Sequence, residues 1–243
     1  MRQALSGGSR APLITRSDDL GLPPTIPGMD LLETLRSTGA VRGFTTDPVA
    51  DATVASVLDA ARFAPSGGNK QPWRVAVVKD PALRQTMAEL MRPVWEEYMG
   101  ANAVGHRPFA FGRSIDAAPV AVPNALIDDI TSVPVVLAVA ADLRDIAIMD
   151  GNLDRPPVVG GASIYPFCWS ILLASRAHGL GGVMTTFLSR AEPAAATPLG
   201  LPADHALVAT IFMGVPTHQN TKLRRKPVNS FATIDRFDGD SLP

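Results

Sequence analysis

Cysteine is almost absent from this chain of 243 residues: Cys168 is the only one, so no intramolecular disulfide can form. Long apolar runs are missing too, because Val133–Ala141 and Ala206–Val215 fall well short of the roughly 20 residues that cross a bilayer. Residues 1–28 contain arginines and aspartates and no sustained apolar block, which argues against a secretory signal. We therefore expect a cytoplasmic protein without a membrane partner.

An excess of charge of one sign is also lacking. The 22 Lys and Arg residues nearly balance 23 Asp and Glu residues, for a net charge of −1. Such a chain has no positive electrostatic field that would attract a polyanion, so we do not expect nucleic acid as a partner. The four histidines (His106, His178, His205 and His218) show no metal-ligand spacing, and we expect no metal site.

Several catalytic motifs are missing as well. The chain has no G-x-G-x-x-G after a strand, no Walker A loop, no H-E-x-x-H and no G-x-S-x-G. Cys168 lies in an apolar segment and is interpreted as a small core residue. If the protein is an enzyme, its chemistry is expected to come from a cofactor and not from catalytic side chains.

Apolar periodicity predicts helices that begin near Asp30, Asp51 and Asp80, the last of which runs to about Tyr98. A further, buried helix is predicted over Ala162–His178, ending at Gly179. Four strands are predicted, at Trp73–Val78, Val133–Ala141, Gly182–Leu188 and Leu207–Gly214. Their irregular mixture with helices favours an α+β fold over a doubly wound one. Residues 1–28 are interpreted as an extended N-terminal arm, and residues 29–243 as a single domain.

Four segments carry polar groups suited to a ligand: Arg36–Phe44, Ala64–Trp73, Gly179–Phe187 and Lys222–Pro227. They offer arginines beside a small-residue turn, a Gly-rich loop with Asn and Gln, a backbone turn into a strand, and a run of cations. Taken singly, each also has a purely structural interpretation. These are solvated arginines at a helix end, a tight loop, an ordinary helix end and a basic tail.

Taken in order, the motifs in these segments form a pattern. Val41-Arg42-Gly43-Phe44 is followed by Pro48-Val49, and Ala-Pro-Ser-x-x-Asn-x-Gln-Pro-Trp runs without a break from Ala64 to Trp73. Gly-Leu-Gly follows the predicted buried helix, Gly-x-Pro ends the last strand, and a basic segment closes the pattern. Over roughly residues 30 to 235 the chain resembles the FMN-dependent nitroreductase family.

The resemblance implies a nitroreductase-like fold, with a central, mostly antiparallel sheet flanked by helices. It also implies an intertwined homodimer with two FMN sites at the subunit interface. The residues that it assigns to FMN fall into three groups. They are Arg42 with Arg224 or Arg225 at the phosphate; Pro65, Ser66, Asn69 and Gln71 from the partner subunit; and backbone N–H groups at Thr185 and Thr186 near flavin N5.

The implied reaction passes two electrons from NAD(P)H, through FMN, to a small organic acceptor such as a nitroaromatic or a quinone, in a ping-pong cycle. The alternatives are a same-fold flavoenzyme with another task (a deazaflavin donor, dehalogenation or flavin fragmentation), a non-catalytic FMN-binding protein, or an interaction domain without a cofactor. The family turn often reads Arg-x-Ser-x-Arg, where this chain has Thr38, Ala40 and Arg42. The irregular stretch Gly100–Asp129, with Phe109, Phe111 and Arg113, is predicted to cover the substrate.

Overall fold

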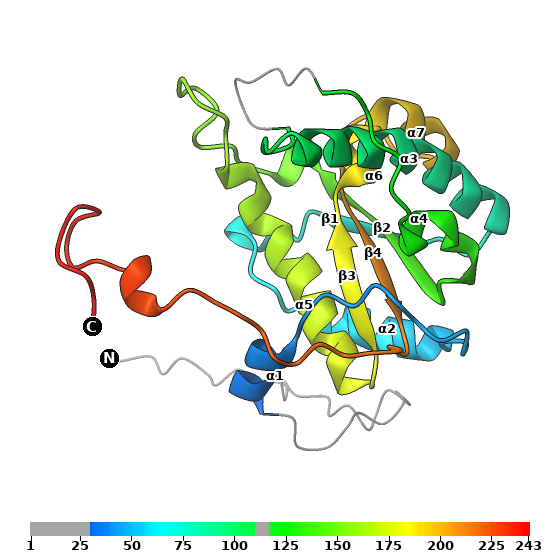
Figure 1. Ribbon diagram of the computed structural model, residues 1–243, viewed down its shortest axis with the longest axis horizontal. Helices are drawn as coiled ribbons and strands as arrows, with labels where there is room; N and C mark the ends of the chain where they lie inside the picture. The colour runs from blue at the N-terminus through cyan, green and yellow to red at the C-terminus, as the bar shows by residue number, and fades with distance from the viewer. Residues whose placement is uncertain (1–29, 110–116) are drawn as a thin grey trace, which may run out of the picture.

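The computed structural model describes residues 30–109 and 117–243 (Figure 1). The expected N-terminal arm, residues 1–28, lies outside the described residues, as do Phe111 and Arg113 of the predicted cover. Among the helices in the described ranges, none is both long and apolar enough to span a bilayer.

A single sheet of four strands forms the centre of the described part of the chain. Its strands are β1 (Trp73–Val77), β2 (Val135–Asp142), β3 (Gly181–Thr185) and β4 (His205–Gly214). They lie in the order β1-β2-β4-β3, and every neighbouring pair is antiparallel. The prediction of an α+β fold around an antiparallel sheet is confirmed.

Helices cover both faces of this sheet (Figure 1). On one face, α2 (Asp51–Ala61) and α5 (Tyr165–Ala177) pack against alternate residues of β2 and β4. The opposite face carries four helices: α3 (Pro81–Ala103), α4 (Ala125–Asp128), α6 (Phe187–Arg190) and α7 (Glu192–Leu199). Because both faces are covered, all eight residues of β2 are buried. The short helix α1 (Leu31–Ser37) packs against α5.

Local sequence signals account for several helix ends. The Asp30 carboxylate accepts hydrogen bonds from the backbone N–H groups of Leu32 and Glu33, at 2.9 and 3.1 Å, and so caps α1. Asp80 caps α3 in the same way. Beyond the end of α5, Gly179 adopts a positive φ of 71°, a conformation that glycine takes without strain.

Several element ends differ from the sequence prediction, among them the ends of α3 and β3. Helix α3 continues to Ala103, past the expected end near Tyr98, because Gly100 and Ala101 are buried and Gly100 packs closely against the backbone of Ala118. Strand β3 ends at Thr185 and not at Leu188, because Phe187 already begins α6. The second difference matters for the site, since it places Thr186 in a turn between a strand and a helix.

Candidate functional site

The turn that carries Arg42 lies between β3 and the chain that follows β4. The backbone N–H of Val41 donates to the Gly182 carbonyl at 3.0 Å, and that of Thr217 donates to the Gly43 carbonyl at 3.1 Å. A Cβ on Gly181 would lie only 2.6 Å from Cγ2 of Val41. The second glycine of the Gly-Leu-Gly motif therefore allows the Arg42 turn to dock on the sheet.

The junction between β3 and α6 presents polar groups to the same region. Thr185 ends the strand and Thr186 is the N-cap residue of α6, where the chain changes direction. The Oγ1 atom of Thr185 is buried and has no hydrogen-bond partner within the part of the chain that the structure describes. A buried hydroxyl without a partner is uncommon in folded proteins, so this atom is suited to meet a polar atom of a ligand.

Arg42, Thr185 and Thr186 meet in one cavity of about 620 Å³, which we call the Arg42 cavity. An aromatic wall closes one side of it. Trp95 lies edge-on to Phe187 at 5.5 Å, Tyr98 lies edge-on to Phe187 at 5.9 Å, and the Trp95 indole N–H donates to the Val122 carbonyl at 2.7 Å. The structure therefore brings together three of the predicted residues beside a fixed apolar wall, which suits a flat ligand.

Sequence reasoning missed Trp95 and Tyr98, which also line the Arg42 cavity, whereas Asn124 in the lining belongs to the stretch Gly100–Asp129 that was predicted to cover the substrate. Trp95 and Tyr98 stand three positions apart on α3, a spacing that places two side chains on one helix face. The spacing of this aromatic pair was the sequence signal that could have identified both residues as part of the cavity wall. Asn124 caps α4 by accepting from the N–H of Leu126 at 3.2 Å.

The guanidinium of Arg42 is available to bind an anion. No ion pair involves Arg42 in the ranges 30–109 and 117–243. Thr38, in contrast, is engaged, because its hydroxyl donates to the Thr34 carbonyl at 2.7 Å and is buried. Of the three positions that correspond to the family's Arg-x-Ser-x-Arg turn, only Arg42 therefore presents a charged group to the cavity.

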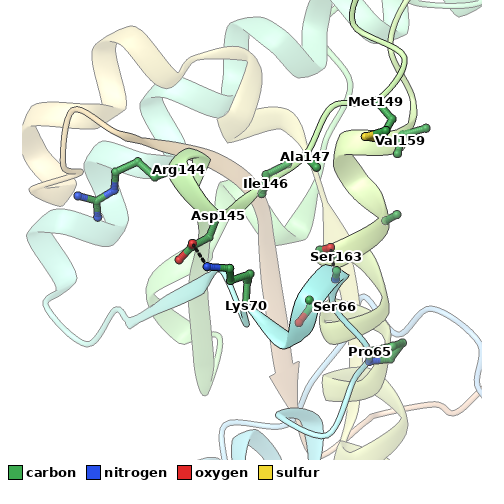
Figure 2. Close-up of a pocket in the computed structure, with 13 residues that line it drawn as sticks. Pro65, Ser66, Lys70, Arg144, Asp145, Ile146, Ala147, Met149, Val159 and Ser163 are labelled. Carbon is green, nitrogen blue, oxygen red and sulfur yellow. Dashed lines mark hydrogen bonds and ion pairs between the residues drawn. The ribbon is translucent and has the colours of Figure 1, made fainter.

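The Ala64–Trp73 loop lies at a different cavity, of about 560 Å³, which Figure 2 shows. Pro65 and Ser66 line it, and the two cavities share no residue. Two hydrogen bonds at 3.0 Å hold the loop: Gln71 N–H to the Ser66 hydroxyl, and Gly67 N–H to the Ser163 hydroxyl. Lys70 approaches Asp145 at 3.5 Å, the dashed contact in Figure 2.

Asn69 and Gln71 do not line this second cavity. Both have positive φ angles, 54° and 51°, and the Gln71 side-chain amide donates to Oδ1 of Asn69 at 3.1 Å. Both residues are exposed. Their amides therefore remain open to a neighbour outside the described chain.

Arg224 and Arg225 lie on the extended segment that runs away from the sheet after β4, past α1 (Figure 1). Both are exposed, neither lines the Arg42 cavity, and Arg225 donates to the Arg224 carbonyl at 2.7 Å. Within one chain, the two tail arginines therefore lie apart from Arg42 and from the Ala64–Trp73 loop.

The fold agrees with comparisons to known proteins. The model of the nitroreductase family matches residues 35–215, so the chain belongs to the nitroreductase family. It is 33% identical to the 5,6-dimethylbenzimidazole synthase of Rhodobacter capsulatus, over 76% of this chain and 83% of that protein. It is 30% identical to the nitrobenzene nitroreductase of Ectopseudomonas oleovorans, over 79% of this chain and 88% of that protein.

The fold also matches that of a Desulfovibrio desulfuricans nitroreductase solved in complex with FMN. The TM-score is 0.62 at 21% identity, over 86% of this chain and 99% of the other. The prediction of a nitroreductase-like fold is confirmed. A nitroreductase-family oxidoreductase is the class of protein that the fold and the family model define.

Proposed function

We propose that the protein binds FMN in the Arg42 cavity and passes two electrons from NAD(P)H to a small organic acceptor. The observation that carries this proposal is the meeting of Arg42 with the β3–α6 junction in one aromatic-walled cavity. The relative from Ectopseudomonas oleovorans, a nitrobenzene nitroreductase, supports an organic acceptor of this kind.

The residues present fit FMN on structural grounds. The wall formed by Trp95, Tyr98 and Phe187 suits a flat ring system, and the partnerless Thr185 hydroxyl suits a polar ring edge. Bound FMN supplies the capacity to accept and release a pair of electrons. The backbone at Thr185 and Thr186 offers N–H donors to the ring, and Arg42 stabilises negative charge held near it.

We further propose that the site is completed by a second copy of the chain. The Ala64–Trp73 loop and the Arg224–Arg225 pair lie away from the Arg42 cavity of their own chain. In a homodimer they would contact the FMN and the phosphate bound by the partner. Exposed apolar side chains on α1 and α5, among them Leu31, Leu32 and Trp169, supply a surface for such a contact.

An absorbance spectrum of the purified protein tests the proposal, recorded before and after anaerobic addition of NADPH or NADH. We expect flavin bands that bleach on addition and return when an acceptor such as nitrobenzene is supplied. If the bands bleach only with a reduced deazaflavin, the electron donor is a deazaflavin and not NAD(P)H. Absence of flavin bands, even after incubation with FMN, would refute the cofactor assignment.

A second candidate function is 5,6-dimethylbenzimidazole synthesis, which is favoured by the 33% identity to the Rhodobacter capsulatus synthase. Product analysis separates the two. Reduced FMN and oxygen are incubated with the protein, and the benzimidazole is sought by mass spectrometry. Its formation, together with slow reduction of nitrobenzene, would favour the synthase assignment over the reductase.

A further inference from the structure

A third cavity, of about 370 Å³, lies on the sheet face that carries α7, beside the edge strand β1. We call it the α7 cavity. It shares no residue with the Arg42 cavity. Its floor comes from β1, β2 and β4, and one side is formed by the chain from Leu199 to Pro202, where α7 ends.

The floor is apolar because of small side chains in register across the sheet. Arg74 pairs with Ala140 and Ala76 pairs with Ala138, while Ala140 pairs on its other side with Leu207. Protein interiors are otherwise packed to high density, so larger side chains at these positions would fill the space. The three alanines therefore create a pocket with a methyl-lined floor.

Arg74 brings a positive charge to this pocket. The only hydrogen bond of its side chain in the described chain goes from Nη1 to the Trp73 carbonyl, at 3.0 Å, and no ion pair involves Arg74 there. The second arginine of the lining, Arg144, is occupied. It donates to the Asp142 carboxylate at 2.9 and 2.6 Å and approaches Asp204 at 3.4 Å. Arg74 is thus the guanidinium that remains available to a ligand.

A buried histidine adds a second polar group. The His205 side chain is only 6% exposed, and its Nε2 lies 3.8 Å from the Asp142 carboxylate. Its Nδ1 is buried and has no hydrogen-bond partner among residues 30–109 and 117–243, although His205 lines the cavity. A buried ring nitrogen left without a partner is costly, and a carboxylate oxygen beside Nδ1 would relieve that cost by accepting a hydrogen bond from it when Nδ1 carries the ring proton.

We propose that the α7 cavity binds a small organic carboxylate with an apolar body. The acid group pairs with Arg74 beside His205, and the apolar body covers the alanine floor. This site is separate from the flavin reaction and does not depend on it. An alternative role for Arg74 is to discourage the edge strand β1 from pairing with strands of other molecules. That role would not explain the cavity or its alanine floor.

Calorimetric titration of the purified protein with octanoate and with octanamide, its neutral analogue, tests the proposal. We expect octanoate to bind about ten-fold more tightly or better, a difference of ~1.4 kcal/mol. Arg74→Met should remove that preference, and Arg74→Lys should keep part of it. Ala76→Leu, at an exposed position of β1, should weaken both probes about ten-fold by filling the cavity.

Two matched variants locate the binding. Arg42→Met removes a cation from the other cavity, and Val77→Leu enlarges a side chain on the opposite face of β1; both should leave octanoate binding unchanged. Equal binding of octanoate and octanamide would overturn the proposal. So would binding that survives both Arg74→Met and Ala76→Leu, or no binding of either probe at millimolar concentration.

Discussion

At the scale of single residues, Arg42 and Arg84 are two cations used in opposite ways. Arg42 is exposed at a cavity and has no carboxylate partner in the described ranges. Arg84 is buried at 7% exposure, and burial lowers its pKa. Its guanidinium donates only to backbone carbonyls. We propose that the first binds a ligand, whereas the second connects backbone segments within the fold.

Arg42→Ala should weaken FMN retention about ten-fold or more, because a charge-assisted hydrogen bond to an anion is lost. The measurement is the dissociation constant for FMN, from flavin fluorescence. Arg62→Ala is the control, since Arg62 lies on the outside of α2 and pairs with Asp59. Full flavin occupancy in the Arg42 variant would show that Arg42 is not part of the FMN site.

Arg84→Met should lower the free energy of unfolding by about 2–4 kcal/mol, because buried carbonyls lose a charged donor. These carbonyls belong to Val78, Thr131, Val133 and Pro134, at 2.6 to 3.4 Å. Urea unfolding followed by circular dichroism measures the change. The control Arg92→Met removes an exposed pair with Asp128 and should cost less than about 1 kcal/mol. Equal losses in the two variants would contradict the role of Arg84.

At the scale of elements, the loop between β2 and α5 depends on one buried carboxylate. Asp150 is 5% exposed and accepts from the N–H groups of Val158 and Val159, and from Arg155. The Val158 N–H, then the Arg155 side chain, lower the pKa of Asp150 from its ordinary value to about 2. Residues of this loop, Met149 and Val159, line the cavity in Figure 2.

Because the pKa of Asp150 is lower in the folded protein than in the unfolded chain, its stabilising effect is complete above about pH 4. It is lost as the pH falls from about 4 to about 2. Hydrogen exchange at the Val158 and Val159 amides should therefore show protection that declines across this range. Asp150→Asn should remove that pH dependence, whereas Asp154→Asn, in the same loop, should retain it. Protection that is the same at pH 2 and pH 5 in the unsubstituted protein would contradict this account.

The same scale shows what the sequence could predict. Helix caps at Asp30 and Asp80, and the glycine after α5, are local signals and mark real element ends. The ends that were wrong depend on distant packing. Apolar residues after Thr185 continue the strand pattern, but Leu188 packs under α3 as part of a helix. Trp95 and Asn124 join the site for a similar reason, since only the folded chain brings α3 and α4 to β3.

At the scale of the whole molecule, the predicted FMN contacts fall into separate regions of one chain. Arg42, Thr185 and Thr186 share a cavity, whereas Asn69 and Arg224 lie outside it. A site composed of two chains explains this distribution. The homodimer remains a prediction, and sedimentation should show a species of twice the chain mass.

Subunit mixing provides a sharper test. In dimers of Arg42→Ala, or of Asn69→Ala, both sites are defective. In a mixed dimer, one site carries both substitutions and the other carries neither. Random reassociation of equal amounts should therefore restore about a quarter of the unsubstituted activity. Activity equal to the average of the two variants would show that each chain builds its site alone.

The pairing of β2 with β4 has a consequence for how the protein is made. Strand β2 is apolar and buried along its whole length, yet its partner β4 is separated from it by residues 143–204. During synthesis, β2 leaves the ribosome with only β1 to pair with, and its other edge stays open until β4 follows. A nascent chain halted near residue 200 would therefore expose a strand of high β-propensity, and it should be a better chaperone client than the finished protein.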